Sequence, residues 1–166
     1  MTALDIEIAV IKYFNPRQNI IVPNVSWGPW NKEYKTLHEC DIISLTGSSW
    51  ATEIEIKVSK ADLLKDNEKR HGHTHNLIRR LYFAVPEEMK DFALANIPER
   101  AGLIVVSARR NANRRYVEFA KECKINKQAV KWTDKQRFQL ARLGAMRILG
   151  LKEKRKSNIK RKEVKK

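Results

Sequence analysis

Short apolar runs separated by turn-forming residues dominate the first two thirds of the chain, and several segments carry the periodicity of amphipathic helices. The patterns predict helices at residues 2–14, 59–66, 86–95 and 133–149, and strands at residues 19–27, 37–45, 50–58, 79–85, 101–107 and 116–120. The strand, helix and strand over residues 79–107 form a βαβ unit, whose two strands are expected to run parallel. We therefore expect an α/β fold with one mixed central sheet flanked by helices.

The first predicted helix has an apolar stripe that is interrupted by one acid. Glu7 lies in the middle of the face formed by Leu4, Ile8, Ile11 and Phe14. A carboxylate on a buried face is costly unless it is paired, protonated or bound to a cation. Glu7 therefore either pairs with a buried Arg or Lys or faces a charged site.

The helix at 133–149 opens with a Thr-x-x-Gln capping box. Its apolar stripe, which we expect to pack on the sheet, consists of Phe138, Ala141, Ala145 and Ile148. Beyond Gly150 the chain is strongly basic, and we expect residues 151–166 to be disordered because so polar a segment cannot bury a core. Residues 1–150 then form a single domain.

Acidic side chains follow two neighbouring strands with a period of two. Glu53, Glu55 and Lys57 point to one face of their strand, and Ile54 and Ile56 point to the other. If residues 47–49 form a three-residue turn, Asp41 lies opposite Glu55 on the same face, and Glu39 lies opposite Lys57. A loop with an even number of residues would place Asp41 and Glu55 on opposite faces.

Opposed carboxylates repel each other unless a cation lies between them. Mg²⁺ prefers one or two carboxylates completed by phosphate and water oxygens. Asp41, Glu55 and Lys57 together are the parts that metal-assisted phosphodiester hydrolysis needs, since the lysine can orient the attacking water or stabilise charge on the phosphate. Glu7 could be a further ligand or could hold a ligand in place.

The positive charge of the chain is confined to its last third. The formal net charge is +15, but residues 1–107 hold 13 basic and 14 acidic side chains, whereas residues 108–166 hold 21 basic and 5 acidic ones. A basic segment of this kind indicates a polyanionic partner or a solvated tail. The basic side chains best placed to contact phosphates are Arg109, Arg110, Arg114 and Arg115.

Composition excludes several classes of protein. The chain has no apolar run of about 18 residues and no basic-apolar leader at its N-terminus, so neither a membrane span nor a signal peptide is predicted. Cys40 and Cys123 lack the spacing of a disulfide framework or a structural zinc site, and we expect both to be reduced. These features favour a cytoplasmic protein.

The order of these elements resembles the core of the PD-(D/E)xK nuclease superfamily, whose restriction-endonuclease-like fold has the order α-β-β-β-α-β. The segments EIEIKVSKADLLKD and LYFAVPEEM…AGLIVV resemble in particular the small bacterial and phage group that includes MmcB-like DNA repair proteins, over about residues 3–107. The resemblance implies Mg²⁺-dependent cleavage of DNA, with Mn²⁺ as a substitute, in repair, recombination or phage DNA processing. It makes Asp41, Glu55 and Glu7 metal-associated acids and Lys57 the catalytic lysine. Cys40 stands where the superfamily pattern has proline.

Weaker candidates lie around this core. Lys60, Arg70 and His75 could contact DNA phosphates from the segment after the lysine-bearing strand. The alternating His71, His73 and His75 could indicate zinc, but a zinc site needs further ligands, and an exposed loop is the favoured interpretation. Trp27 and Trp30 could stack on bases or belong to the core.

Two alternative functions remain open. The chain could be a DNA-binding module that no longer cuts, such as a subunit of a larger repair machine, although the complete set of Asp41, Glu55 and Lys57 argues against lost activity. A homodimer is compatible with either function. It could also be a basic RNA-binding protein, although the neutral, acid-bearing core is a poor RNA surface.

Overall fold

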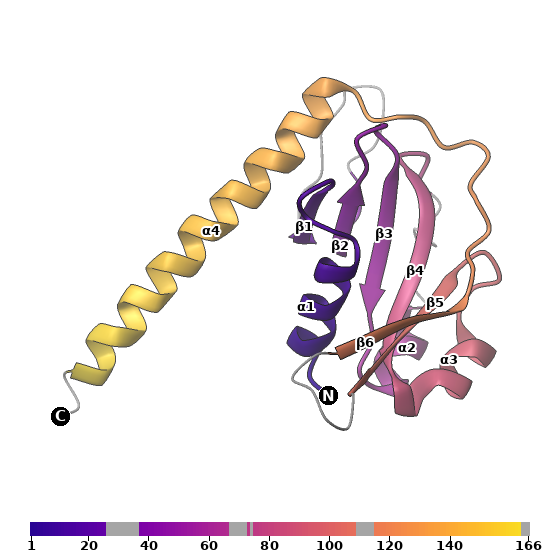
Figure 1. The fold of residues 1–166 in the computed structure, drawn as a ribbon, viewed down its shortest axis with the longest axis horizontal. Helices are drawn as coiled ribbons and strands as arrows, with labels where there is room; N and C mark the ends of the chain where they lie inside the picture. Colours follow the sequence, from indigo (N-terminus) through magenta and orange to yellow (C-terminus); the bar gives the residue numbers. More distant parts are fainter. Residues whose placement is uncertain (26–36, 67–72, 74, 109–114, 164–166) are drawn as a thin grey trace.

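The computed structural model describes residues 1–25, 37–66, 73, 75–108 and 115–163, and Figure 1 shows them as an α/β fold with a six-stranded mixed sheet flanked by helices. The helices are α1 (Ala3–Tyr13), α2 (Lys60–Asp66), η1 (Glu87–Met89), α3 (Lys90–Asn96) and α4 (Asp134–Glu163). The strands are β1 (Ile20–Val25), β2 (Cys40–Leu45), β3 (Ala51–Ile56), β4 (Ile78–Pro86), β5 (Gly102–Ala108) and β6 (Arg115–Lys121). Each corresponds to a segment expected from the sequence, with ends that differ by a few residues in most cases.

The strands lie side by side in chain order. The first three are antiparallel, β3, β4 and β5 are parallel, and β6 returns antiparallel to β5. Parallel neighbours need a crossover connection, and the segments that contain α2 and α3 provide the two crossovers. The parallel pair β4 and β5 confirms the expected βαβ unit.

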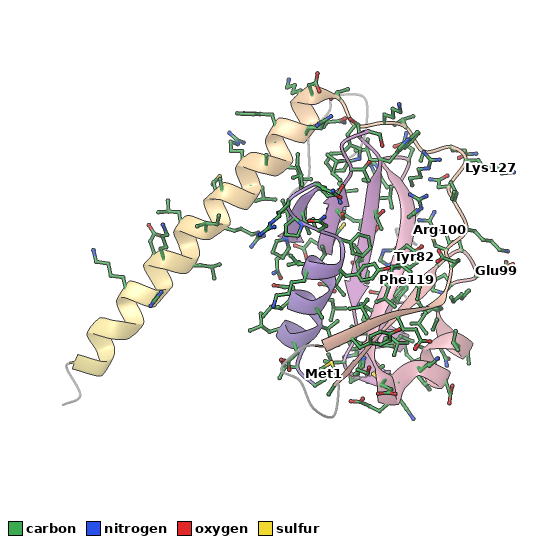
Figure 2. All side chains as sticks on the ribbon, viewed as in Figure 1. Met1, Tyr82, Glu99, Arg100, Phe119 and Lys127 are labelled. Carbon is green, nitrogen blue, oxygen red and sulfur yellow. The ribbon has the colours of Figure 1, made fainter. Side chains whose placement is uncertain are left out.

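One face of the sheet packs against α1. Ile42, Ile54 and Tyr82 form a buried cluster there with residues of the helix. Figure 2 shows Tyr82 beside Phe119 of β6, with ring centroids 5.1 Å apart in an edge-to-face arrangement. The residues of α1 that this face buries are Ile6, Ala9 and Val10.

The apolar stripe expected for the first helix is therefore wrong in part. Leu4 and Ile8 are exposed, whereas Ile6, Ala9 and Val10 are buried. Helical periodicity is compatible with either face of α1 being buried. The sheet buries the face that contains Ala9, whose small side chain allows the helix to approach the sheet closely. Glu7 is consequently half-buried at the edge of the packed face and does not lie at its centre.

Two apolar clusters cover the opposite face of the sheet. One joins β1 and β2 to α4 through residues such as Ile43, Leu140 and Leu143. The other joins β4 and β5 to α2 and α3 through residues such as Leu81 and Phe83. The polar residues of β3 on this face lie between the two clusters.

Helix α4 is longer than expected and packs through a different face. Thr133 and Gln136 form the predicted cap: the Gln136 backbone N–H donates to Thr133 Oγ1 at 3.3 Å, and the Thr133 N–H donates to Gln136 Oε1 at 2.8 Å. The expected stripe of Phe138, Ala141, Ala145 and Ile148 is exposed, and Leu140 and Leu143 are buried instead. Gly144 follows them, where a Cβ would lie 3.2 Å from Val22 Cγ2, so this face allows the helix to approach β1 closely.

The basic segment after Gly150 continues this helix to Glu163, so the expectation of disorder is wrong for residues 151–163. Lys, Arg and Glu are good helix formers, and no proline interrupts the segment. Figures 1 and 2 show the C-terminal half of α4 projecting away from the sheet. In the described part of the chain, no helix is both long and apolar enough to cross a membrane.

Candidate active site and buried ion network

The hairpin between β2 and β3 has the register expected from the sequence. Ile42 pairs with Ile54 and Ile43 with Glu53, and continuing this register places Asp41 opposite Glu55. The turn is a three-residue connection, since the Thr46 N–H donates to the Trp50 carbonyl at 3.0 Å and Ser49 adopts a φ of 67°. The odd loop is confirmed, and both carboxylates lie on the same face of the sheet.

The carboxylates of Asp41 and Glu55 each face a backbone N–H group of the neighbouring strand. The Ile56 N–H donates to Asp41 Oδ2 at 2.8 Å, and the Asp41 N–H lies 3.4 Å from Glu55 Oε1. Glu55 is buried and Asp41 is half-buried. These contacts hold both carboxylates at the start of β2 and the end of β3.

The carboxylates open into a cavity of about 320 Å³. Its lining residues include the pair and come from β1, β2, β3 and α4 or, for Glu39 and Lys57, from positions directly beside β2 and β3: Asn24, Val25, Glu39, Cys40, Asp41, Glu55, Lys57 and Arg147. The lining carries three carboxylates and two cationic side chains, so the cavity suits a charged or strongly polar ligand. Helix α4 contributes Arg147 to the lining. The sequence did not predict that this arginine lies near the acids.

Glu7 lies next to this cavity without being among its lining residues. Glu7 Oε2 accepts a hydrogen bond from Asn24 Nδ2 at 3.3 Å, and Arg147 donates to the Asn24 carbonyl. Partial burial raises the pKa of Glu7, while Asn24 and Arg147 act to lower it. Asn24 adopts a φ of 53°, a left-handed conformation that asparagine tolerates, and it connects Glu7 to the cavity wall.

Lys57 is held between two buried carboxylates. Its Nζ lies 3.0 Å from Glu55 Oε2 and 2.9 Å from Asp66 Oδ1 at the end of α2. Burial alone would lower the pKa of Lys57, but the attraction of Glu55 and the hydrogen bond to Asp66 raise it above its usual range. The side chain is therefore a fixed cation at the wall of the cavity.

Asp66 also belongs to a second buried group that the sequence did not predict. His73 bridges two carboxylates, with Nε2 at 2.6 Å from Asp66 Oδ2 and Nδ1 at 2.6 Å from Glu53 Oε1. His38 Nε2 lies 2.7 Å from the same Glu53 oxygen. A continuous chain of polar contacts thus runs from His38 through Glu53, His73 and Asp66 to Lys57.

Burial and hydrogen bonding act against each other in this chain. Burial raises the pKa of Glu53, but hydrogen bonds from His38 and His73 outweigh it and lower the pKa to about 2. Burial lowers the pKa of His73, but hydrogen bonds to Asp66 and Glu53 raise it to about 9. In the metal-free protein His73 is therefore a cation between two anions.

His38, Glu53 and His73 form a group that could hold a metal ion, because one ligand atom from each lies within 4.8 Å of the other two. The alternation of Glu53 with Glu55 in the sequence could have indicated Glu53 as a member of this group. The burial of His73 could not be predicted, because the surrounding segment contains no apolar residue. The expectation of an exposed loop is wrong at His73, which is only 1% exposed.

The remaining predicted contacts with DNA fall into two groups. Lys60 is exposed with its Nζ 5.0 Å from the Phe92 ring centroid, and His75 Nδ1 accepts the Leu77 N–H at 3.1 Å. Neither is among the lining residues of the cavity. Several expected residues lie outside the described part of the chain, namely Trp27, Trp30, Arg70, His71, Arg109, Arg110 and Arg114. Arg115 begins β6. Cys40 and Cys123 are free thiols, as expected.

Comparisons with known proteins identify a fold relative. No protein-family model and no curated protein matches the chain. Among solved structures, the chain is similar to SPO1766, a protein of unknown function from Silicibacter pomeroyi, with a TM-score of 0.59 and 18% sequence identity. The match covers 90% of this chain and 87% of that chain. The two proteins therefore share a fold over most of both chains.

Proposed function

We propose that the protein is a Mg²⁺-dependent nuclease that hydrolyses phosphodiester bonds of DNA. The observation that carries this proposal is the convergence of Asp41, Glu55 and Lys57 on one cavity from adjacent strands. Carboxylates paired across two strands, with a lysine two residues after the second, match the pattern of the PD-(D/E)xK superfamily that the sequence resembles. The shared register explains why this spacing is needed, since all three side chains must lie on one face.

The donor set fits a hard divalent cation. Asp41 and Glu55 supply two carboxylates beside an open polar cavity, and Mg²⁺ takes one or two carboxylates with water and phosphate oxygens completing its shell. When bound, the cation would polarise the phosphate and lower the pKa of a coordinated water. Glu7 contacts the lining residue Asn24 and is not itself a lining residue, so its role is to hold Asn24 in place and not to bind the cation directly.

Lys57 and Arg147 supply the positive charge of the site. Lys57 Nζ is anchored by Glu55 and Asp66, which fixes where it can donate a hydrogen bond to a phosphate oxygen or to the attacking water. Fixed donors stabilise developing negative charge because no reorganisation is needed as the reaction proceeds. Arg147 approaches from α4 and is placed to hold a neighbouring phosphate.

Helix α4 provides the surface for the DNA backbone. Its 30 residues span about 45 Å, comparable to about 13 base pairs of duplex. Residues 151–166 carry 9 basic and 2 acidic side chains, and residues 151–163 continue the same helix beyond Arg147. A cleavage site beside the middle of this helix, with the basic half of the helix beyond it, would let backbone contacts orient the strand without reading its sequence.

Cleavage assays with single-stranded, duplex and branched DNA test the proposal directly. We expect cleavage with Mg²⁺ or Mn²⁺ and none with EDTA. Asp41→Asn and Glu55→Gln should each reduce the rate by roughly 100-fold or more, as loss of one charge-stabilising group does in other enzymes. Asn at position 41 can still accept the Ile56 N–H, so the strand contact survives while the charge is lost.

The control variant is Glu88→Gln, an exposed acid in η1 that is not among the lining residues of the cavity. It should retain full activity, and urea unfolding should verify that each variant is folded. Cleavage that persists in both Asp41→Asn and Glu55→Gln would refute the assignment of the site. DNA binding by the folded wild type without cleavage of any substrate would refute the nuclease proposal and favour a binding module.

A further inference from the structure

A second cluster of ligand-type side chains lies apart from the lining of the cavity. Two imidazole nitrogens converge on one carboxylate oxygen: His38 Nε2 at 2.7 Å and His73 Nδ1 at 2.6 Å from Glu53 Oε1. The three atoms lie within 4.8 Å of one another. Unlike Asp41 and Glu55, this group is dominated by nitrogen donors, and none of its members lines the cavity.

We propose that His38, Glu53 and His73 bind a transition-metal ion of the Zn²⁺ class, at a site separate from the Asp41–Glu55 pair. Zn²⁺ is commonly bound by imidazole and carboxylate together, whereas Mg²⁺ selects oxygen donors and retains its waters. The chemistry of the two clusters therefore assigns different metals to them. The proposal stands independently of the nuclease activity.

The orientation of His73 is the second observation in favour of a metal. Asp66 Oδ2 takes the Nε2 side of the ring at 2.6 Å, which leaves Nδ1 to face Glu53 and His38. Metal-bound histidines almost always donate their other ring N–H to a carboxylate or carbonyl, which sets the tautomer and the direction of the ring. Arg100 Nη2 also donates to the His73 carbonyl at 2.6 Å, so the residue is anchored through its backbone as well.

The state of Glu53 is the third observation. Its side chain is completely buried, and its Oε2 accepts no N–H or O–H hydrogen bond among the described residues, although the Cys40 thiol and the Arg100 guanidinium interact with the carboxylate. A buried carboxylate oxygen of this kind recovers only part of its desolvation cost, and a bound cation would offset more of it. An ion at this point would face Oε1 and could also reach Oε2, as carboxylate ligands often bind through either or both oxygens.

Binding requires a small expansion of the cluster. Ligands about 2.0–2.1 Å from a tetrahedral zinc lie about 3.3 Å from each other. The two imidazole nitrogens would therefore move back from Glu53 Oε1 by roughly 0.6 Å, as the ion replaces the protons that now mediate these contacts. Asp66 contacts both His73 and Lys57, so an ion bound to His73 would also restrict the position of Lys57 in the cavity lining.

The experiment uses the full chain, first stripped with EDTA and then dialysed against a large excess of Mg²⁺ and a small excess of Zn²⁺ over the protein. We expect one equivalent of Zn²⁺ to remain bound under conditions where Mg²⁺ fills the carboxylate pair. Long-range ¹H–¹⁵N correlation spectra of the histidine rings should show large shifts of His38 Nε2 and His73 Nδ1. The rings of His75 should be unaffected, because its Nδ1 accepts the Leu77 N–H.

Matched variants separate this site from the carboxylate pair. His38→Ala should weaken Zn²⁺ binding at least tenfold, and Asp66→Asn should weaken it by about 10- to 100-fold through the orientation of His73. Asp41→Asn should leave Zn²⁺ binding unchanged. His38 precedes β2, and His73 still contacts Glu53 Oε1 in His38→Ala, so this variant is expected to fold.

Two results would overturn the proposal. One is an absence of ring nitrogen shifts in the wild-type protein, a measurement that needs no variant. The other is Zn²⁺ binding that survives in His38→Ala and is lost in Asp41→Asn, which would place the ion at the carboxylate pair.

Discussion

Replacing His73 by Phe tests whether the buried polar chain stabilises the fold. His73 forms hydrogen bonds of 2.6 Å to both Glu53 and Asp66, whose exposed fractions are 0% and 3%. Phe keeps a ring of similar size beside Phe83, whose ring centroid lies 5.9 Å away. The substitution therefore removes both hydrogen bonds and one positive charge while largely preserving packing.

The expected loss of unfolding free energy is about 3–5 kcal/mol, the range for breaking a buried ion pair and leaving its partner uncompensated. Two hydrogen bonds to charged groups, each worth about 1.5–3 kcal/mol, sum to about 3–6 kcal/mol, which overlaps this range. Domains are stable by only about 5–15 kcal/mol, so the variant would lose a large part of its stability. The equilibrium constant of unfolding would rise by two to nearly four orders of magnitude at about 1.4 kcal/mol per factor of ten.

Urea unfolding followed by circular dichroism in EDTA measures this loss without a contribution from bound metal. A double-mutant cycle with Asp66→Asn isolates the His73–Asp66 contact, and the double variant should be more stable than the sum of single losses predicts by about 1–3 kcal/mol. His75→Phe is the matched control, since His75 Nδ1 accepts the Leu77 N–H at 3.1 Å, and the loss of this hydrogen bond should cost about 0.5–1.5 kcal/mol. A loss below about 1 kcal/mol for His73→Phe, or strict additivity in the cycle, would refute the reasoning.

Two further predictions concern packing and charge. Gly102→Ala should destabilise the protein by about 1–3 kcal/mol, because its Cβ would lie 2.3 Å from Tyr82 Cε1 and 2.7 Å from the Lys121 carbonyl oxygen. Gly150→Ala, where nothing lies within 4 Å, is the control and should leave the thermal midpoint unchanged or slightly raised; equal effects of the two would contradict the packing argument. Truncation after Gly150 removes 9 basic and 2 acidic residues and should weaken DNA binding, measured by fluorescence anisotropy, with a shallower dependence on salt. The thermal midpoint should not change, and unaltered DNA affinity at low salt would exclude residues 151–166 as a backbone-binding surface.

The hairpin that carries the carboxylates could be predicted from the sequence because its determinants are local. The three-residue turn and the period of two together predict that Asp41 and Glu55 lie on one face of the hairpin. The observed pairing of β2 with β3 agrees with this prediction. The caps at Thr2 and Thr133 are local in the same way, since each needs only a partner three residues later.

The packing faces of the long helices could not be predicted with the same success. Helix α4 offers one arc through Phe138 and Ile148 and another through Leu140 and Leu143, and periodicity does not rank them. The choice depends on how closely each arc can approach β1, and Gly144 lies on the arc that is buried. It also brings Arg147 to the cavity, which is why the sequence alone did not connect this residue with the acids.

By itself, the sequence determined the order of the elements, the hairpin register and the alternation of charge along β3, because these depend on contacts between near neighbours in the chain. Only the tertiary structure decided that this charged face is covered. Asp66 of α2 and the distant His38 and His73 converge on β3 between two apolar clusters, and this burial turns Glu53 from a surface acid into the centre of an ion network. The physical reason is that solvation, which sets the cost of a charge, depends on what folds over a residue and not on its neighbours in sequence.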